Sequence, residues 1–186
     1  DLNSFGANDL VTPNMDKIVN SGIKFTQFYA SPICSPSRAT LLTGKNPQRA
    51  GVPGNIPSVP VTEKGLRGEQ YTMAEMFKDA GYQTALIGKW HLGDQEGMLP
   101  NDQGFDYAFG HHVGCIDNFS HFYYWRGPNR HDLYRNGKEV FYDGQFFPSF
   151  LLKEAKEFLE NREDKPFFLF YAMNSPHYPY QVTPEW

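Results

Sequence analysis

The stretch Cys34–Gly44 reads CSPSRATLLTG, and it places a thiol, a guanidinium and a helix stop signal close together. It follows an apolar run, Ile23–Ala30, that is typical of a strand, and its own pattern predicts a helix over about Pro36–Thr43. A helix N-terminus carries unpaired N–H groups and positive potential, which favour anions and activate thiols. Arg38 adds a planar fork of donors that matches an oxyanion. The pattern indicates that Cys34 is a reactive residue facing an anionic group; a half-buried structural cysteine is the alternative.

The composition is that of a globular chain with room for a substantial core. Apolar residues make up 40% and aromatic residues 16% of the 186 residues, unlike a disordered chain. The formal net charge is −4 without a basic run, which argues against nucleic acid or an anionic membrane surface as the main partner. Cys34 and Cys115 are too few for a disulfide framework. No apolar stretch is long enough to span a membrane.

Predicted helices and strands alternate along the chain, with Gly- and Pro-rich or aromatic loops between them. Helices are expected from Pro13 to Gly22, over Pro36–Thr43, from a capping box at Thr72-Met73-Ala74-Glu75 to Gly81, and over Ser149–Asn161. Strands are expected over Ile23–Ala30, Tyr82–Ile87 and Pro166–Met173, the last buried on both faces, with a hairpin at Leu133–Phe141 and irregular structure over Gly104–Trp125. This order predicts an α/β fold, a mainly parallel sheet sandwiched by helices.

Side chains with useful chemistry follow the predicted strands at the point where each strand ends. Cys34 and Arg38 follow the first strand, Lys89 and His91 the second, and His177 the third. Ligands of open α/β sheets bind outside the carboxyl ends of the strands. We therefore expect these side chains to meet in one cationic pocket with a nucleophile and candidate general acids. Each of these residues alone could be an ordinary loop residue. The prediction of a pocket therefore depends on their occurring together, each after a predicted strand.

Several motifs, in this order along the chain, resemble the type I sulfatases of the alkaline-phosphatase-like superfamily. Cys-x-Pro-Ser-Arg and Leu-Thr-Gly within Cys34–Gly44 are similar to the first sulfatase signature. Gly81–Thr84 and Gly88–Gly93 are similar to the second. Further similar segments are Thr12–Asp16, Gly104–Asp106 and Pro176–Pro179. The resemblance covers nearly the whole chain and implies the alkaline-phosphatase-like fold.

The resemblance implies hydrolysis of sulfate esters, of a sulfated sugar or an aryl alcohol, by a formylglycine-dependent sulfatase. A maturation enzyme would oxidise Cys34 to formylglycine, an aldehyde whose hydrate is the nucleophile, and Arg38 would hold it in place. Lys89 and His91 would bind the sulfate and the formylglycine. His177 would contact the sulfate or protonate the leaving oxygen.

The same resemblance implies a Ca²⁺ ion, with Mg²⁺ possible, that has Asp1 and Cys34 as ligands. Asp1 resembles the second aspartate of the family's Asp-Asp-Leu motif. The first aspartate, a later Asp-Asn metal pair and a further sulfate-binding lysine are expected outside this chain. We therefore expect residues 1–186 to be a single partial catalytic domain, truncated at both ends and inactive or nearly so by itself.

Substrate contacts are predicted in the aromatic loops. Asp117 and His121, with Tyr123 and Trp125, would hydrogen-bond to or stack on a sugar; packing within the loop is the alternative for the aromatic rings. The loops over 46–70 and 104–130 would border the entrance. A zinc site made by His111, His112 and His121 is not expected, because no His/Cys pair there has the usual ligand spacing.

Two other functions remain open at this stage. A phosphonate or phosphodiester hydrolase of the same superfamily can share the Cys-x-Pro-x-Arg element. A non-catalytic relative would bind sulfated glycans and keep Cys34 unmodified. The expected partners are a sulfated small molecule or glycan and the maturation enzyme. A location outside the cytoplasm (periplasmic, secreted or lysosomal) is expected, with the targeting segment outside this chain.

Overall fold

The computed structural model describes residues 2–162 and 164–185, and it consists of two compact units, residues 1–30 and 31–186. In the first unit, a short 3₁₀ helix, η1 (Asn3–Phe5), precedes α1 (Pro13–Ser21), and Pro13 begins that helix as predicted. The strand predicted over Ile23–Ala30 does not form, since the segment is irregular. The prediction of one partial domain over the whole chain therefore stays a prediction.

The second unit is built on a five-stranded sheet with the order β4-β3-β2-β1-β5. The strands are β1 (Gln83–Lys89), β2 (Tyr107–His111), β3 (Tyr134–Arg135), β4 (Lys138–Glu139) and β5 (Phe167–Ala172). The pairs β1–β2 and β1–β5 are parallel, and the short hairpin β3–β4 adds an antiparallel edge. The mainly parallel sheet is therefore confirmed. The irregular structure predicted over Gly104–Trp125 is wrong where β2 forms.

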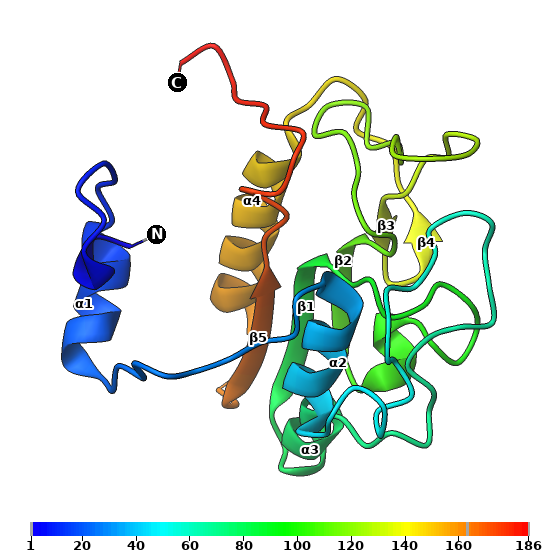
Figure 1. Ribbon diagram of the computed structural model, residues 1–186, viewed down its shortest axis with the longest axis horizontal. Coiled ribbons are helices and arrows are strands. Elements are labelled where there is room, and N and C mark those ends of the chain that lie inside the picture. Colours follow the sequence, from blue (N-terminus) through cyan, green and yellow to red (C-terminus); the bar gives the residue numbers. More distant parts are fainter. Residues whose placement is uncertain (1, 163, 186) are drawn as a thin grey trace. The chain divides into compact units, whose positions relative to one another are not determined.

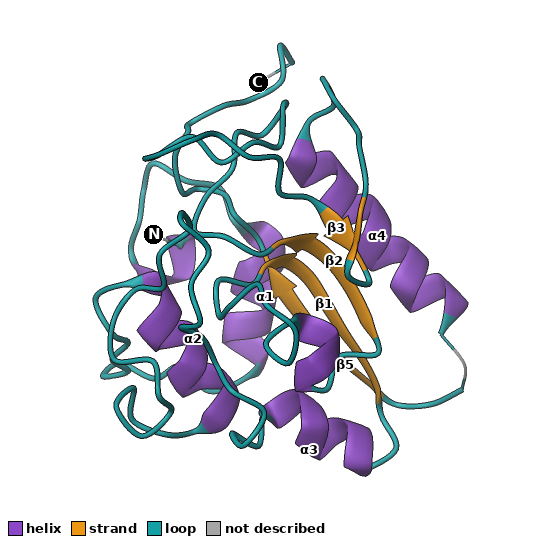
Figure 2. Ribbon diagram, turned by 90° about the vertical axis from the view of Figure 1, so that its right-hand side faces the viewer, coloured by secondary structure: helices purple, strands orange, loops and turns teal. Residues whose placement is uncertain are grey.

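Helices cover both faces of this sheet, as the sequence predicted (Figures 1 and 2). Successive side chains of a strand point to opposite faces. On β1, Leu86 packs in the core cluster that includes residues of α2 (Cys34–Thr43) and α3 (Met73–Asp79). Its neighbour Ile87 packs in the other cluster, with α4 (Phe147–Asn161). The sheet is thus the middle layer of three.

Local signals determine where several elements begin and turn. Thr72 and Glu75 form the predicted capping box: the Glu75 N–H donates to the Thr72 hydroxyl at 3.1 Å, and the Thr72 N–H donates to the Glu75 carboxylate at 2.7 Å. At the tip of the β3–β4 hairpin, Asn136 and Gly137 have φ of 48° and 73°, the left-handed pair that a tight type I′ turn requires. These predictions are confirmed.

Two glycines near the carboxyl ends of β1 and β2 occupy positions where a Cβ would clash with the backbone of the neighbouring strand. Gly88 has φ +124°, and a Cβ placed on it would lie 2.0 Å from the carbonyl oxygen of Ala172 on β5. Gly110 has φ +148°, and its Cβ would lie 1.8 Å from the carbonyl oxygen of Gly88. Only glycine fits such positions. The residues that follow, Lys89 and His111, are therefore held at this tight edge of the sheet.

Two further features qualify the sequence predictions. β5 has β1 as its one neighbour in the described sheet, and most of its residues are half-buried, so the prediction of a strand buried on both faces is wrong for the described residues. Within the described residues, no helix is both long and apolar enough to cross a membrane.

Candidate active site

Cys34 is the first residue of α2, at the N-terminus of the helix. The preceding residue, Ile33, is extended and makes no capping hydrogen bond with its side chain. The buried Ser35 fixes this end: its N–H donates to the Asn55 amide oxygen at 3.2 Å, and its hydroxyl accepts from the Ile56 N–H at 3.2 Å. The helix begins two residues before its predicted start, so the thiol belongs to its first turn.

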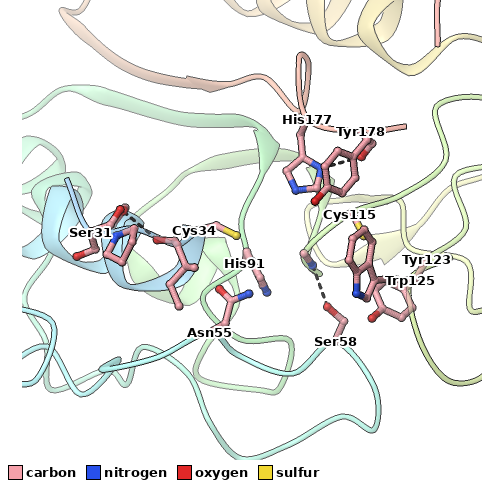
Figure 3. A pocket seen from close by; sticks show the side chains of 14 residues that line it. Ser31, Cys34, Asn55, Ser58, His91, Cys115, Tyr123, Trp125, His177 and Tyr178 are labelled. Carbon is pink, nitrogen blue, oxygen red and sulfur yellow. Dashed lines mark hydrogen bonds between the residues drawn. The ribbon is translucent and has the colours of Figure 1, made fainter. Parts of the chain in front are cut away.

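A cavity of about 570 Å³ opens beside this helix end. Cys34, His91 and His177 line it together (Figure 3). The structure thus brings together three side chains that are distant in sequence. They come from the start of α2, the loop after β1 and the loop after β5, although no strand precedes Cys34 among the residues that the structure describes. Other lining residues include Asn55, Ser58, Cys115, Tyr123, Trp125 and Tyr178.

Lys89, the last residue of β1, reaches Cys34 from inside the protein. Its side chain is almost fully buried, with 3% of the residue exposed. Burial lowers the pKa of Lys89 and the Arg38 guanidinium lowers it further, while the Cys34 thiol beside it has the opposite effect. A buried ammonium of this kind is expensive unless an anion accompanies it. Lys89 and Arg38 are not among the residues that line the cavity, so the predicted contact of Lys89 with a sulfate stays a prediction.

Arg38 is tied to the same strand end. Its Nη1 donates to the carbonyl oxygen of Lys89 at 2.6 Å. Burial lowers the pKa of Arg38 to about 10, against the raising effect of Cys34, so the guanidinium is still charged at neutral pH. Its contact with Lys89 links α2 to β1 and fixes the thiol relative to the ammonium. The predicted role of Arg38, holding a modified Cys34, stays a prediction.

His91 is buried, strained and neutral. Its backbone φ is 56°, a left-handed conformation that is uncommon for histidine. Its Nε2–H donates to the Ile56 carbonyl oxygen at 2.9 Å, and Nδ1 has no hydrogen-bond partner among the described residues. Burial, with Lys89 nearby, lowers the pKa of His91 to about 3. The free nitrogen is therefore suited to accept a hydrogen bond from a hydroxyl group and, with so low a pKa, is a poor base.

His177 lies at the exposed rim of the cavity, in the loop after β5 (Figure 3). Its Nδ1–H donates to the carbonyl oxygen of Tyr178 at 2.7 Å. The Tyr178 ring in turn stacks on Trp125, with ring centroids 5.2 Å apart. This leaves Nε2 of His177 available to a ligand, so the predicted contact with sulfate or with a leaving oxygen is compatible with the geometry.

Asp117 and His121, the other predicted substrate contacts, are not among the residues that line the cavity. The Asp117 carboxylate accepts hydrogen bonds from the N–H groups of Phe119 and Ser120 and from the Gln181 amide at 2.6 Å. His121 is fully buried and donates to the Gln145 carbonyl oxygen at 3.0 Å. Both side chains are engaged in the loop itself. Substrate binding by them remains a prediction that this cavity does not support.

Sequence reasoning missed Cys115 as part of the cavity, because it missed β2. Asp132 holds the turn that follows β2: its buried carboxylate accepts from the N–H groups of His112 and Val113 at 3.0 and 2.8 Å. Burial raises the pKa of Asp132 to about 7, although these hydrogen bonds and Arg130 lower it. The chain then leads to Cys115. If β2 had been predicted, the residues that follow its carboxyl end, Cys115 among them, would have been candidates for the site.

The residues around the cavity do not provide a calcium site by themselves. Ca²⁺ is bound by about 6–8 oxygen ligands, mostly carboxylates and carbonyls. Among the described residues, those that line the cavity include no aspartate or glutamate. The predicted ligand Asp1 lies outside the described residues. The donor set of the described residues that line the cavity therefore does not fit a calcium ion.

Comparison with known proteins defines the class of protein. The family model described as Sulfatase matches residues 1–186, and the chain belongs to the sulfatase family. It is 33% identical to an arylsulfatase of Klebsiella aerogenes, over 100% of this chain and 42% of that protein. It is 35% identical to arylsulfatase G of Rattus norvegicus, over 99% of this chain and 40% of that protein. The chain thus spans about two fifths of the length of these relatives.

Solved structures agree with this assignment and with the alkaline-phosphatase-like fold. Ps i-CgsB in complex with k-i-k-neocarrahexaose superposes with a TM-score of 0.89 at 31% identity, over 99% of this chain and 44% of that one. BT4656 in complex with its substrate D-glucosamine-2-N,6-O-disulfate gives a TM-score of 0.75 at 31% identity, over 99% of this chain and 33% of that one. Family membership implies a metal and a formylglycine residue in general terms.

Proposed function

We propose that the protein to which this chain belongs hydrolyses sulfate esters at the cavity beside α2. The observation that carries the proposal is the position of Cys34. It lies at a helix N-terminus, in the same cavity as His91 and His177 and beside the buried side chain of Lys89. The positive end of a helix dipole and a buried cation together favour a tetrahedral anion such as sulfate.

Cys34 is in the position that the modified residue requires. Formylglycine, once made from this cysteine, supplies as its hydrate the hydroxyl that attacks sulfur. The free Nδ1 of the neutral His91 would accept a hydrogen bond from such a hydroxyl and orient it. Arg38 keeps the start of α2 in place against β1 through its bond to the Lys89 carbonyl. These residues would hold and orient the nucleophile.

Lys89 would balance the negative charge of the sulfate, and His177 would protonate the leaving oxygen. The ammonium of Lys89 lies in a dry environment, where its attraction for the sulfate oxygens is stronger than in water. His177 stands at the open rim, where the alcohol part of an ester would leave. Nε2 of a protonated His177 would donate a proton to that oxygen.

The metal of the whole protein is proposed to be Ca²⁺, with Mg²⁺ as the alternative. Asp1 and the modified Cys34 would contribute ligands, and the remaining oxygen ligands would come from parts of the protein beyond the described residues. Without those ligands, residues 1–186 alone should turn over sulfate esters slowly or not at all.

The substrate class is proposed to be a sulfated sugar, with simple aryl sulfates as surrogates. The solved relatives named above bind a carrageenan oligosaccharide and a disulfated glucosamine. In this chain Trp125 and Tyr178, stacked on each other at the cavity, present aromatic surface of the kind that sugars pack against. A maturation enzyme that oxidises Cys34 is the proposed protein partner, and a location outside the cytoplasm is proposed with it.

The test is expression of the full-length protein together with a formylglycine-generating enzyme, followed by assays with aryl sulfate, aryl phosphonate monoester and sulfated sugars. We expect sulfate release that disappears in Cys34→Ala. The matched control is Cys115→Ala, which removes the other cysteine of the same cavity and should retain most of the activity. Preferential turnover of the phosphonate, or sugar binding without turnover by a protein with an unmodified Cys34, would overturn the proposal.

A further inference from the structure

Three side chains that the proposed reaction does not use converge elsewhere in the second unit. His121, His131 and Asp143 each offer one ligand atom, and these three atoms lie within 4.8 Å of one another. They come from the loop after β2, the segment before β3 and the loop between β4 and α4. The two imidazole rings lie edge to face, with centroids 6.2 Å apart.

Both histidines have one nitrogen bonded in the way that metal ligands usually do. Nε2–H of His121 donates to the Gln145 carbonyl oxygen at 3.0 Å. Nδ1–H of His131 donates to the Glu139 carboxylate at 2.8 Å. A ligating histidine almost always donates its other N–H to a carbonyl or a carboxylate, which fixes the ring and its tautomer. These bonds engage one nitrogen of each ring and leave the second nitrogen for another ligand.

Those two free nitrogens are buried without any partner in the described part of the chain. His121 is fully buried, and the side chain of His131 is 6% exposed. Neither Nδ1 of His121 nor Nε2 of His131 has a hydrogen-bond partner among the described residues. Two buried imidazole nitrogens without a partner, beside a carboxylate, form an arrangement that a shared cation would complete.

We propose that Nδ1 of His121, Nε2 of His131 and a carboxylate oxygen of Asp143 bind a divalent transition metal. Their donor set favours Zn²⁺. Imidazole and carboxylate ligands suit zinc, whereas calcium takes oxygen ligands alone. Tetrahedral zinc has ligand atoms about 3.4 Å apart, so atoms that lie up to 4.8 Å apart need to approach by up to about 1.4 Å. Asp143 is exposed, so its side chain would make most of this movement, and water would take the fourth position.

The spacing of the ligands in sequence does not reveal this site, because backbone pairing creates it. Phe122 and His131 form an antiparallel bridge, and the N–H of Asp132 donates to the His121 carbonyl at 3.0 Å. The pairing brings the two ends of the loop over 122–130 together, so that His121 and His131 meet. His111 and His112, considered with His121 on spacing alone, are not part of the cluster.

The site would act as a clip at the base of a loop that lines the cavity. Between its two histidines the chain carries Tyr123 and Trp125, which both line the cavity. Asp143 would join the base of this loop to the segment that leads into α4. A metal here would therefore restrain one wall of the cavity without touching the reacting groups.

The proposal is tested by calorimetric titration of Zn²⁺ into the full-length protein, stripped with a chelator and kept in excess Ca²⁺ so that a calcium site stays filled. We expect one Zn²⁺ per chain with micromolar or tighter affinity. Asp143→Asn and His131→Gln should each weaken binding by at least about 100-fold, and Glu139→Ala, which removes the carboxylate behind His131, by about 10–100-fold. Asp164→Asn, an exposed aspartate away from the cluster, is the matched control and should bind as the wild type does.

A second measurement follows the loop itself. Arg126 is exposed at the tip of the loop, so trypsin can cut after it when the loop opens. Zn²⁺ should slow this cut at least about tenfold in the wild type and in Asp164→Asn, and should have no effect in Asp143→Asn, whose exposed substitution leaves the fold intact. Zn²⁺ binding of equal affinity in all variants, or no binding below millimolar concentration, would overturn the proposal.

Discussion

His91 should make the stability of the protein fall as the solution becomes acidic, and the variant His91→Gln should remove that contribution. Burial lowers its pKa from 6.5 to about 3 in the folded state. At about pH 7 the ring is neutral in both states, so it contributes no pH dependence. As the pH falls below 6.5, the unfolded chain takes up a proton that the folded protein cannot. Stability attributable to this group is therefore lost progressively between pH about 6.5 and about 3.

The magnitude follows from the two pKa values. At about pH 5 the unfolded state is protonated at this residue and the folded state is not, which amounts to about 2 kcal/mol of lost stability. Urea unfolding at about pH 7 and about pH 5 measures the loss directly. Glutamine can still donate to the Ile56 carbonyl, so His91→Gln should keep that contact and lose about 2 kcal/mol less than the wild type over this interval.

A matched control separates this effect from general damage to the cavity. Ser58→Ala alters another lining residue without removing a titratable group, and its loss of stability between the two pH values should equal that of the wild type. The reasoning is refuted if His91→Gln and the wild type lose the same free energy of unfolding on acidification. His112, with a pKa lowered to about 4 by burial and by Arg130, should act with the same sign.

Three further substitutions test the fold and the site. Gly88→Ala should destabilise the protein by about 3 kcal/mol or more, because its Cβ would lie 2.0 Å from a carbonyl oxygen. The control Gly54→Ala, whose Cβ would have nothing within 4 Å, should change stability by less than about 1 kcal/mol. Equal melting temperatures of the two variants would contradict this. Thr72→Ala should cost about 1–2 kcal/mol in urea unfolding through the lost helix cap, and an unchanged midpoint would count against it. Lys89→Met in the full-length enzyme should lower kcat/KM by about 100-fold without loss of stability, since a buried ammonium is replaced by an apolar chain of similar size; full activity would exclude the proposed role.

Much of the fold was predictable because its signals are local. The capping box at Thr72, the Asn136-Gly137 turn and the glycine stop after α2 each depend on a few neighbouring residues. Strand formation is different, because it needs a partner strand that the local sequence does not contain. Ile23–Ala30 has strand-like residues but pairs with no strand in the described chain. Tyr107–His111 is short and interrupted by glycine, yet it forms β2 between two neighbours.

The candidate site was predictable to the extent that strand ends determine it. His91 and His177 follow true strands and line one cavity, and Cys34 joins them although the strand expected before it is absent from the described residues. The burial that lowers the pKa of His91 could not be read from the sequence, since it arises from packing against distant loops. The His121–His131 pair could not be predicted for the same reason, because the two residues are brought together by the antiparallel bridge between Phe122 and His131.

The most direct test of the central claim is to measure the chemical state of Cys34 and the activity on the same sample. The full-length protein, matured with a formylglycine-generating enzyme, is analysed by mass spectrometry of the peptide that contains Cys34 and assayed with a sulfate ester. The account predicts that the aldehyde form is present and that the rate of sulfate release rises in proportion to it across preparations. High sulfatase activity with Cys34 as an unmodified thiol would contradict the account.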